Sequence, residues 1–287
     1  MPDNIDSPPE RPAPEDVTGQ VKQVAVTPLP GTAPDSYTAL GGGPAQPIDG
    51  AVPEEVLACI SVNGQELATF MCTPTNLDAL ALGFLYNENI IQSAADVRSL
   101  RVSAASSCVD VWLHDTSVEL PNRAIITAGC GGGVTFDDLS QQHEPLESTM
   151  RVTTAELVEL MRQMHLGSVL YQQARGIHTA ALARDGRILL LVEDIGRHNC
   201  LDKLAGLTLQ QQIPTRDCIL FTSGRISSEM LNKARSMEIP LVCSRTSPTS
   251  LSVALAKSWQ ITLVAYLRQN RMRVYTHHER VLGNGHV

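Results

Sequence analysis

Cys130 is the residue of this sequence best suited to chemistry. It stands in the run Gly129-Cys130-Gly131-Gly132-Gly133, directly after a β-branched segment, so its neighbours in the chain place no side chains over the sulfur. Cysteine reactivity follows thiolate character and exposure, and a glycine-rich loop favours exposure. The other cysteines lie in apolar or periodic stretches, where buried and inert thiols are expected. These are Cys59, Cys72, Cys108, Cys200, Cys218 and Cys243.

Arginine recurs where predicted strands run into helices. The first turn of a helix carries unpaired N–H groups that bind anions, and a guanidinium group binds phosphate oxygens in pairs. Ser, Thr, Asn and Gly also cap helices for structural reasons alone. Because three such loops follow successive strands, they favour a phosphate-bearing ligand. They are Glu193-Asp194-Ile195-Gly196-Arg197-His198-Asn199, Ser223-Gly224-Arg225 and Arg245-Thr246-Ser247-Pro248.

A further basic segment closes the last predicted strand, with the sequence Tyr266-Leu267-Arg268-Gln269-Asn270-Arg271 and then Arg273. Arginines beside an aromatic ring can hold a phosphate and stack on a base, or they can protect an edge strand by charge. The histidines give weaker indications. A structural role at the start of a helix explains His198 as well as contact with a ligand does. Packing is the simpler explanation for His178, which begins a strand. We assign no metal to His277-His278, because adjacent side chains on a strand point to opposite faces.

Composition restricts the class of protein. The chain has 287 residues, enough for one large or two ordinary domains, and its seven cysteines show no paired spacing, which argues against a disulfide framework and for a reducing compartment. A formal net charge of −8 disfavours nonspecific nucleic-acid binding. No stretch approaches the roughly 20 apolar residues of a membrane span. We expect a cytoplasmic protein without a nucleic-acid or membrane partner.

The elements that position Cys130 belong to a predicted α+β part over residues 51–150. Residues 1–50 hold ten of the 17 prolines, and we expect this segment to be largely disordered. Val56–Val62 and Glu66–Met71 predict two strands joined by the tight turn Asn63-Gly64, and a helix follows from Leu77. Further short strands lead to Cys130.

The arginine loops belong to a predicted C-terminal α/β domain over residues 151–287. Thr153 and Glu156 form a capping-box pattern before a helix, and residues 177–192 read as a second hairpin. Three helix–strand repeats follow, which predicts a mostly parallel sheet covered by helices. In such sheets ligands bind outside the carboxyl ends of the strands.

Together these motifs resemble the FdhD family of formate dehydrogenase accessory sulfurtransferases, from about Pro53 almost to the C-terminus. The segments that carry the resemblance are Val62-Asn63-Gly64, Thr73-Pro74, Leu80-Ala81-Leu82-Gly83-Phe84-Leu85, the Cys130 loop, Gly176-Ile177-His178-Thr179-Ala180, Glu193 to Asn199, Ser223-Gly224-Arg225, Ser244-Arg245, Pro248-Thr249-Ser250 and Val274-Tyr275-Thr276-His277.

The resemblance implies a three-layer, cytidine-deaminase-like domain and a cytoplasmic sulfurtransferase. Such a protein accepts sulfur from a cysteine desulfurase and passes it to the molybdenum cofactor, Mo-bis(molybdopterin guanine dinucleotide), for formate dehydrogenase. Cys130 falls on the family's persulfide cysteine. The family's cofactor-binding stretch falls on Tyr266, Leu267, Arg268, Gln269, Asn270 and Arg271, and we add Arg197, Ser223 and Arg225 as candidates that bind this cofactor. The family also implies a homodimer.

One position departs from the family. Its members usually carry a Cys-x-x-Cys pair, whereas this chain has Gly133 at the second place, so a mechanism that needs a resolving thiol does not fit. A single-cysteine carrier still fits. The alternative is a chaperone that binds the molybdenum cofactor without sulfur transfer.

The sequence lacks the residues that two other kinds of chemistry require. Zinc deaminases need His-x-Glu and Pro-Cys-x-x-Cys, but His178 is followed by Thr179-Ala180 and the sequence has no Pro-Cys pair. A thioredoxin-like redox role needs a second cysteine at the required spacing.

Overall fold

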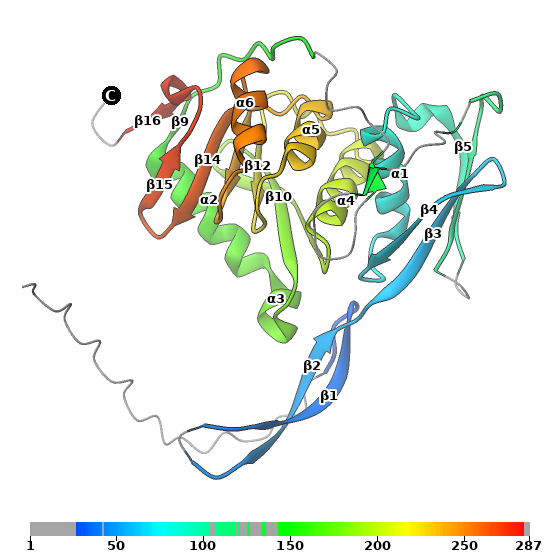
Figure 1. The fold of residues 1–287 in the computed structure, drawn as a ribbon, viewed down its shortest axis with the longest axis vertical. Coiled ribbons are helices and arrows are strands. Elements are labelled where there is room, and N and C mark those ends of the chain that lie inside the picture. The colour runs from blue at the N-terminus through cyan, green and yellow to red at the C-terminus, as the bar shows by residue number, and fades with distance from the viewer. Residues whose placement is uncertain are drawn as a thin grey trace, which may run out of the picture.

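A computed structural model describes residues 27–41, 43–103, 107–118, 120 and 143–283, together with the backbone of 125–126 and 134–135. Within these residues the molecule is built in layers (Figure 1). A four-stranded sheet packs on α1 (Leu77–Asn87), which packs on a layer formed by α4 (Arg197–Gln210), α5 (Ser228–Ser236) and α6 (Ser250–Ser258). That layer covers one face of a six-stranded sheet, and α2 (Thr154–Gly167) covers the other face.

The six-stranded sheet forms the predicted α/β domain, in the order β11-β10-β12-β13-β14-β15. Its strands are β10 (His178–Arg184), β11 (Arg187–Asp194), β12 (Ile219–Thr222), β13 (Leu241–Ser244), β14 (Thr262–Arg268) and β15 (Arg271–Val274). Apolar side chains lie on both faces, because helices cover both. The three-layer arrangement is therefore as expected, while the closer likeness to cytidine deaminase stays a prediction.

The directions of the strands refine the expected mostly parallel sheet. The strands β11, β12, β13 and β14 all run in the same direction. Among neighbouring strands of the sheet, however, only β12–β13 and β13–β14 form parallel pairs. The hairpin strand β10 lies between β11 and β12 and runs against both, and β15 turns back along β14. The sheet is mixed because both hairpins stay within it, and the expectation of mostly parallel pairing is wrong.

The smaller sheet has the order β4-β3-β6-β5 and buries one face against α1. Its strands are β3 (Val56–Val62), β4 (Gln65–Cys72), β5 (Val97–Val102) and β6 (Val109–Leu113). Asn63 and Gly64 form the turn between β3 and β4. Their φ angles are 51° and 85°, the positive values that a two-residue hairpin turn requires. The turn predicted from Asn63-Gly64 is confirmed.

A third β structure lies in the proline-rich segment. Strands β1 (Thr32–Ala39) and β2 (Gln46–Pro53) pair antiparallel and extend away from the two sheets (Figure 1). The ring of Tyr37 lies over Gly50 on the opposite strand, and Thr32 Oγ1 donates to Gln173 at 2.7 Å. The expectation of disorder over residues 1–50 is therefore wrong for this hairpin, because cross-strand pairing outweighs the proline content; residues 1–26 lie outside the described residues.

Several short elements complete the fold. The helical ones are η1 (Ala94–Asp96), α3 (Val169–Ala174) and η2 (His278–Arg280), and the strands are β7 (Ile125–Ile126), β8 (Val134–Thr135), β9 (Val152–Thr153) and β16 (Val281–Leu282). Thr153 caps α2 through its side chain, which accepts from the Glu156 N–H at 3.1 Å, as the sequence predicts. Residues 143–150, assigned above to the first part, pack on the second: Leu146 belongs to its core.

Candidate functional site

One edge of the six-stranded sheet gathers the loops that the sequence singled out. The carboxyl ends of β11, β12, β13 and β14 meet there, because these strands share one direction. Hydrogen bonds tie successive loops together: the Ser244 hydroxyl donates to the Gly224 carbonyl at 2.6 Å, and the Tyr266 N–H donates to the Thr246 carbonyl at 3.0 Å. Arg268 Nε donates to the Arg245 carbonyl at 2.9 Å. The loops after β12 and β13 and the end of β14 are thus held together at this end of the sheet.

The turn between β14 and β15 carries backbone conformations that are unusual for side chains of this size. Tyr266 has a φ of 52° and Gln269 a φ of 51°, and the pairing of β14 with β15 is irregular between Ala265 and Arg268. Such bulges redirect side chains and are common beside functional sites. The guanidinium carbon of Arg273 lies 4.4 Å from the centre of the Tyr266 ring. Near the end of β14, the ring of Tyr266 is therefore stacked against the guanidinium group of Arg273 on β15.

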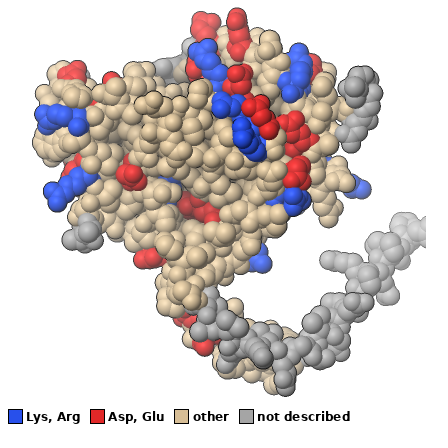
Figure 2. Space-filling view, turned by 180° about the vertical axis from the view of Figure 1, so that it is seen from behind, with Lys and Arg blue, Asp and Glu red and all other residues tan. Residues whose placement is uncertain are grey.

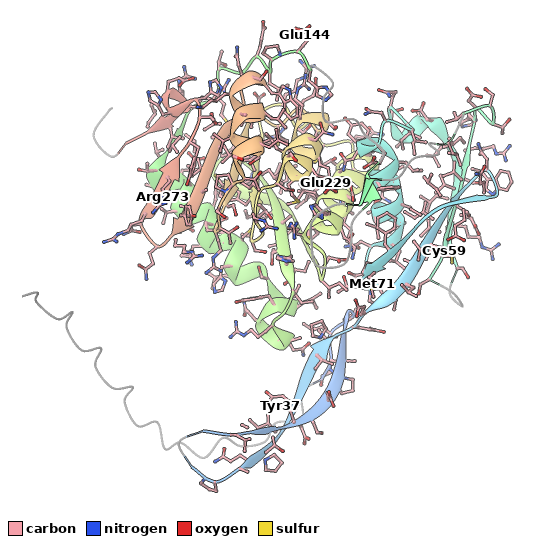
Figure 3. The ribbon with its side chains drawn as sticks, viewed as in Figure 1. Tyr37, Cys59, Met71, Glu144, Glu229 and Arg273 are labelled. Carbon is pink, nitrogen blue, oxygen red and sulfur yellow. A yellow bond between two sulfur atoms is a disulfide. The ribbon has the colours of Figure 1, made fainter. Side chains whose placement is uncertain are left out.

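This turn forms one wall of a cavity of about 700 Å³. The residues that line it are Thr154, Tyr266, Arg268, Gln269, Asn270, Arg271, Met272, Arg273 and Gly283. The set contains three arginines and no carboxylate, in a chain whose net charge is −8. Figure 3 shows Arg273 at the outer edge of the large sheet, on the opposite side of the molecule from Cys59. An anionic ligand with an aromatic part suits this cavity.

The three other candidate residues lie elsewhere on the sheet edge. Arg197 is only 6% exposed and packs on Gly224, where an added Cβ would lie 3.0 Å from the arginine side chain. The Ser223 hydroxyl accepts from the Thr179 N–H at 2.9 Å, which ties it to the start of β10. Arg225 is exposed. None of the three lines the cavity beside Tyr266, so the structure separates them from that turn.

A buried ion pair holds the start of α4, and the sequence reasoning missed it. Lys203 Nζ lies 2.6 Å from Asp194 Oδ2, and both side chains are fully buried. Thr73 donates to the same carboxylate through its N–H and hydroxyl, at 3.1 and 2.9 Å. The other oxygen accepts from Gly196 N and Asn199 Nδ2. The only signal in the sequence was an acidic residue at a strand end and a lysine within an apolar helix.

Two histidines at this end of the sheet have lowered pKa values: His178, which pairs with Asp194 across β10 and β11, and His198 in the first turn of α4. Burial and the nearby Arg197 guanidinium lower the pKa of His198 to about 2. The same two causes lower the pKa of His178, whose Nδ1 lies 3.3 Å from the Ser223 hydroxyl. His198 Nε2 lies 3.1 Å from Glu229 Oε2. This close contact lies between α4 and α5.

The described cysteines divide into two groups. Cys72, Cys200, Cys218 and Cys243 are buried thiols, and burial raises the pKa of Cys72 to about 12 and of Cys218 to about 11. Burial also raises the pKa values of Cys200 and Cys243. These four are inert, as expected.

Cys59 and Cys108 form a disulfide, so the expectation of two buried thiols is wrong, and the argument against a disulfide framework from cysteine spacing did not foresee this pair. Both are half-buried, beside the position where Ile60 of β3 pairs with Val109 of β6. The spacing of the cysteines in the sequence gives no sign that these two strands pair.

Cys130 and Gly133 lie outside the described residues. On either side of them along the chain, β7 and β8 pair antiparallel, with Ile126 opposite Val134. The seven-residue segment that contains Cys130 therefore leaves and rejoins the described chain at neighbouring points. Among the residues the structure describes, no group of three or more His, Cys, Asp or Glu side chains is arranged to hold a metal ion.

Comparison with known proteins assigns the chain to a family. Residues 53–282 match the FdhD/NarQ family. The chain belongs to that family. It is 34% identical over 229 residues to the sulfur carrier protein FdhD of Staphylococcus aureus (strain MRSA252), covering 78% of this chain and 86% of the relative. It is also 34% identical to the protein of that name from Bacillus licheniformis, over 228 residues, 77% of this chain and 86% of the relative.

A solved structure of an FdhD/NarQ relative supports the fold. The crystal structure of a formate dehydrogenase accessory protein from Desulfotalea psychrophila superposes with a TM-score of 0.74 and 28% identity, covering 88% of this chain and all of that chain. The resemblance on which the sequence analysis relied is thus confirmed. None of the described helices combines the length and apolar character that a bilayer crossing requires.

Proposed function

We propose that this FdhD/NarQ protein is a sulfurtransferase that carries sulfur as a persulfide on Cys130 and passes it to a molybdenum cofactor. Two relatives bear the name sulfur carrier protein FdhD, and a structural neighbour is a formate dehydrogenase accessory protein. Formate dehydrogenase is accordingly the proposed client, and a cysteine desulfurase the proposed sulfur donor. The cytoplasm is the proposed compartment and a homodimer the proposed assembly.

The observation that carries this proposal is the state of the other six cysteines. Sulfur transfer needs a thiolate that a donor protein can reach. Burial opposes thiolate formation at four of the cysteines, and two more are joined in a disulfide. Cys130, in its glycine-rich run, remains as the candidate for the carrier thiol.

The sulfur-accepting step is a thiol exchange. The Cys130 thiolate attacks the outer sulfur of the donor persulfide, the S–S bond of the donor breaks, and the donor leaves as a thiolate. Cys130 then holds an S–SH group, and no external oxidant or reductant is needed. Because Gly133 replaces the second cysteine of the usual pair, no neighbouring thiol at that position can attack this persulfide and release the sulfur.

The proposed substrate is Mo-bis(molybdopterin guanine dinucleotide), and the cavity beside Tyr266 is its proposed binding site. Three arginines can hold diphosphate oxygens there, and the Tyr266–Arg273 stack offers a surface for a base. Arg197, Ser223 and Arg225 remain proposed contacts along the same sheet edge. The dinucleotide arm would then anchor the substrate at this end of the sheet.

Intact-mass spectrometry tests the carrier role. The purified chain is incubated with a cysteine desulfurase and cysteine, and we expect a gain of one sulfur atom that dithiothreitol removes. Cys130→Ala should show no gain, whereas the control Cys218→Ala should gain sulfur like the wild type, since Cys218 is buried. Sulfur gain in the Cys130→Ala protein would overturn the proposal.

The replacement of the second cysteine by Gly133 favours one rival, a chaperone that binds the molybdenum cofactor without sulfur transfer. The two functions differ in a cell that lacks the native protein. If Cys130→Ala restores formate dehydrogenase activity there, the chaperone is correct. If it fails while still binding GDP, the sulfur carrier is correct.

A further inference from the structure

The outward face of the small sheet carries the disulfide between Cys59 and Cys108. Successive side chains of a strand point to opposite faces. Ala58, Ile60 and Val62 of β3 are fully buried on the side of α1, so Cys59 lies on the opposite face. Cys108 directly precedes the buried first residue of β6 and lies on that same outward face, where both cysteines are half-buried.

The surface around the disulfide is open in the part of the chain that the structure describes. Leu57 lies two residues before Cys59 on the same face and is 63% exposed, and its partner across β3 and β4, Met71, is 44% exposed. Thr69, which pairs with Cys59, is exposed as well. Surface without charged side chains is extensive on this molecule, as Figure 2 shows for one face, so these residues alone would mark no site. The disulfide among them gives the surface a reactive group that another protein can reach.

Other contacts join β3 and β6 beside the disulfide. Ile60 pairs with Val109 in the parallel ladder that continues from there. Beyond the ladder, the Asn63 N–H donates to the Val111 carbonyl, and the Asn63 side chain accepts from the Leu113 N–H, both at 2.9 Å. Breaking the S–S bond would therefore leave the strands paired. The two cysteine Cα atoms, which lie 4.5 Å apart, would stay close enough for the bond to form again.

Its position on an open face distinguishes this disulfide from the four buried thiols of the described chain. Accessible disulfides are the ones that exchange readily with other thiols. We propose that Cys59–Cys108 is a redox-active disulfide, reduced reversibly by a protein dithiol of the thioredoxin class that contacts Leu57 and Met71. This site is separate from the proposed sulfur carrier chemistry and does not depend on it.

The reduction consists of two thiol–disulfide exchanges. A thiolate of the partner attacks one of the two sulfur atoms, the Cys59–Cys108 bond breaks, and the other cysteine leaves as a thiolate that takes up a proton. The second thiolate of the partner then attacks the mixed disulfide and releases the first cysteine, which is protonated in turn. Two electrons and two protons pass to this chain, and the partner dithiol becomes a disulfide.

NADPH oxidation in the presence of thioredoxin and thioredoxin reductase tests the proposal. The full chain is used with Cys130→Ala, which removes the proposed carrier thiol. We expect the folded chain to consume about one NADPH per molecule, after which iodoacetamide labels Cys59 and Cys108. Cys59→Ser/Cys108→Ser in the same background should consume none. Consumption by the parent chain no greater than by this double variant would overturn the proposal, and peptide mapping of the labelled sites decides the point even where the double variant does not fold.

Leu57→Glu tests recognition of the outward face. We expect it to slow reduction by thioredoxin about five-fold or more, because burying a charge against the partner is unfavourable. Dithiothreitol should reduce the variant at the parent rate, since a small reductant needs no contact with Leu57. Leu251→Glu on α6, where the side chain is 51% exposed, is the matched control and should react like the parent. Equal thioredoxin rates for Leu57→Glu and the parent would refute binding at this face. Because the chains tested lack Cys130, none of these outcomes bears on the carrier role.

Discussion

Gly83 of α1 faces the backbone carbonyl of Asp202 on α4 so closely that no side chain fits between them. A Cβ on Gly83 would lie 1.8 Å from the Asp202 oxygen, and a Cβ on Gly206 would lie 1.9 Å from the Ala79 oxygen. The two helices therefore cross in backbone contact. This crossing joins the small sheet to the large one.

Gly83→Ala should be strongly destabilising. The added methyl group would meet backbone atoms, so the helices must move apart and loosen the packing on both sides. We expect a loss of about 3 kcal/mol or more in the free energy of unfolding, measured by urea denaturation. Gly43→Ala is the control, since its Cβ would meet nothing within 4 Å, and equal stability of the two variants would contradict the argument.

Reduction of the Cys59–Cys108 disulfide should lower the thermal stability. The bond joins residues 49 positions apart, and cross-links of this kind typically stabilise proteins by about 2–4 kcal/mol. Unfolding followed by fluorescence, with and without dithiothreitol, measures the effect. The double variant Cys59→Ser/Cys108→Ser should unfold at the same temperature in both conditions. If the unfolding temperature of the wild type is the same with and without dithiothreitol, the disulfide does not stabilise the fold.

Lys203→Met should destabilise the chain by roughly 3–5 kcal/mol, because it leaves the fully buried Asp194 carboxylate without its cation. The same substitution at the exposed Lys257 should have an effect within about 0.5 kcal/mol. Chemical denaturation compares the two variants. Because Asp194 also accepts from Gly196 N and Asn199 Nδ2, the loss should extend to the start of α4. Hydrogen exchange at that helix would report it.

His198 should make the protein less stable as the pH falls. Its pKa is lowered from 6.5 to about 2, so below pH 6.5 the unfolded chain takes up a proton that the folded chain does not. The free energy of unfolding therefore decreases with falling pH, by roughly 2 kcal/mol at pH 5 from this residue. Glu193 and Asp202, whose pKa values burial raises, act in the opposite direction.

Comparison with His198→Gln isolates this contribution. The variant lacks the titrating ring, so its stability should fall less than that of the wild type between pH 7.5 and pH 5. Urea denaturation at both pH values gives the difference. Parallel losses in the two proteins would show that His198 takes up its proton in the folded state as readily as in the unfolded one.

The sequence by itself determined the local structure. Asn63-Gly64 specifies a hairpin turn because both residues tolerate positive φ, and Thr153 specifies the start of α2 because its side chain reaches the Glu156 N–H. Motifs spread from Pro53 towards the C-terminus were also enough to indicate the family. The turn, the helix start and each single motif depend on residues only a few positions apart in the sequence.

The tertiary structure alone decided how distant segments meet. It joined Cys59 to Cys108, placed β10 between two strands that run against it, and paired Lys203 with Asp194. It also separated Arg197, packed on Gly224, from Arg268, which lines the cavity beside Tyr266. These outcomes follow from strand order and helix crossing, and both depend on the packing of whole surfaces rather than on local backbone preference.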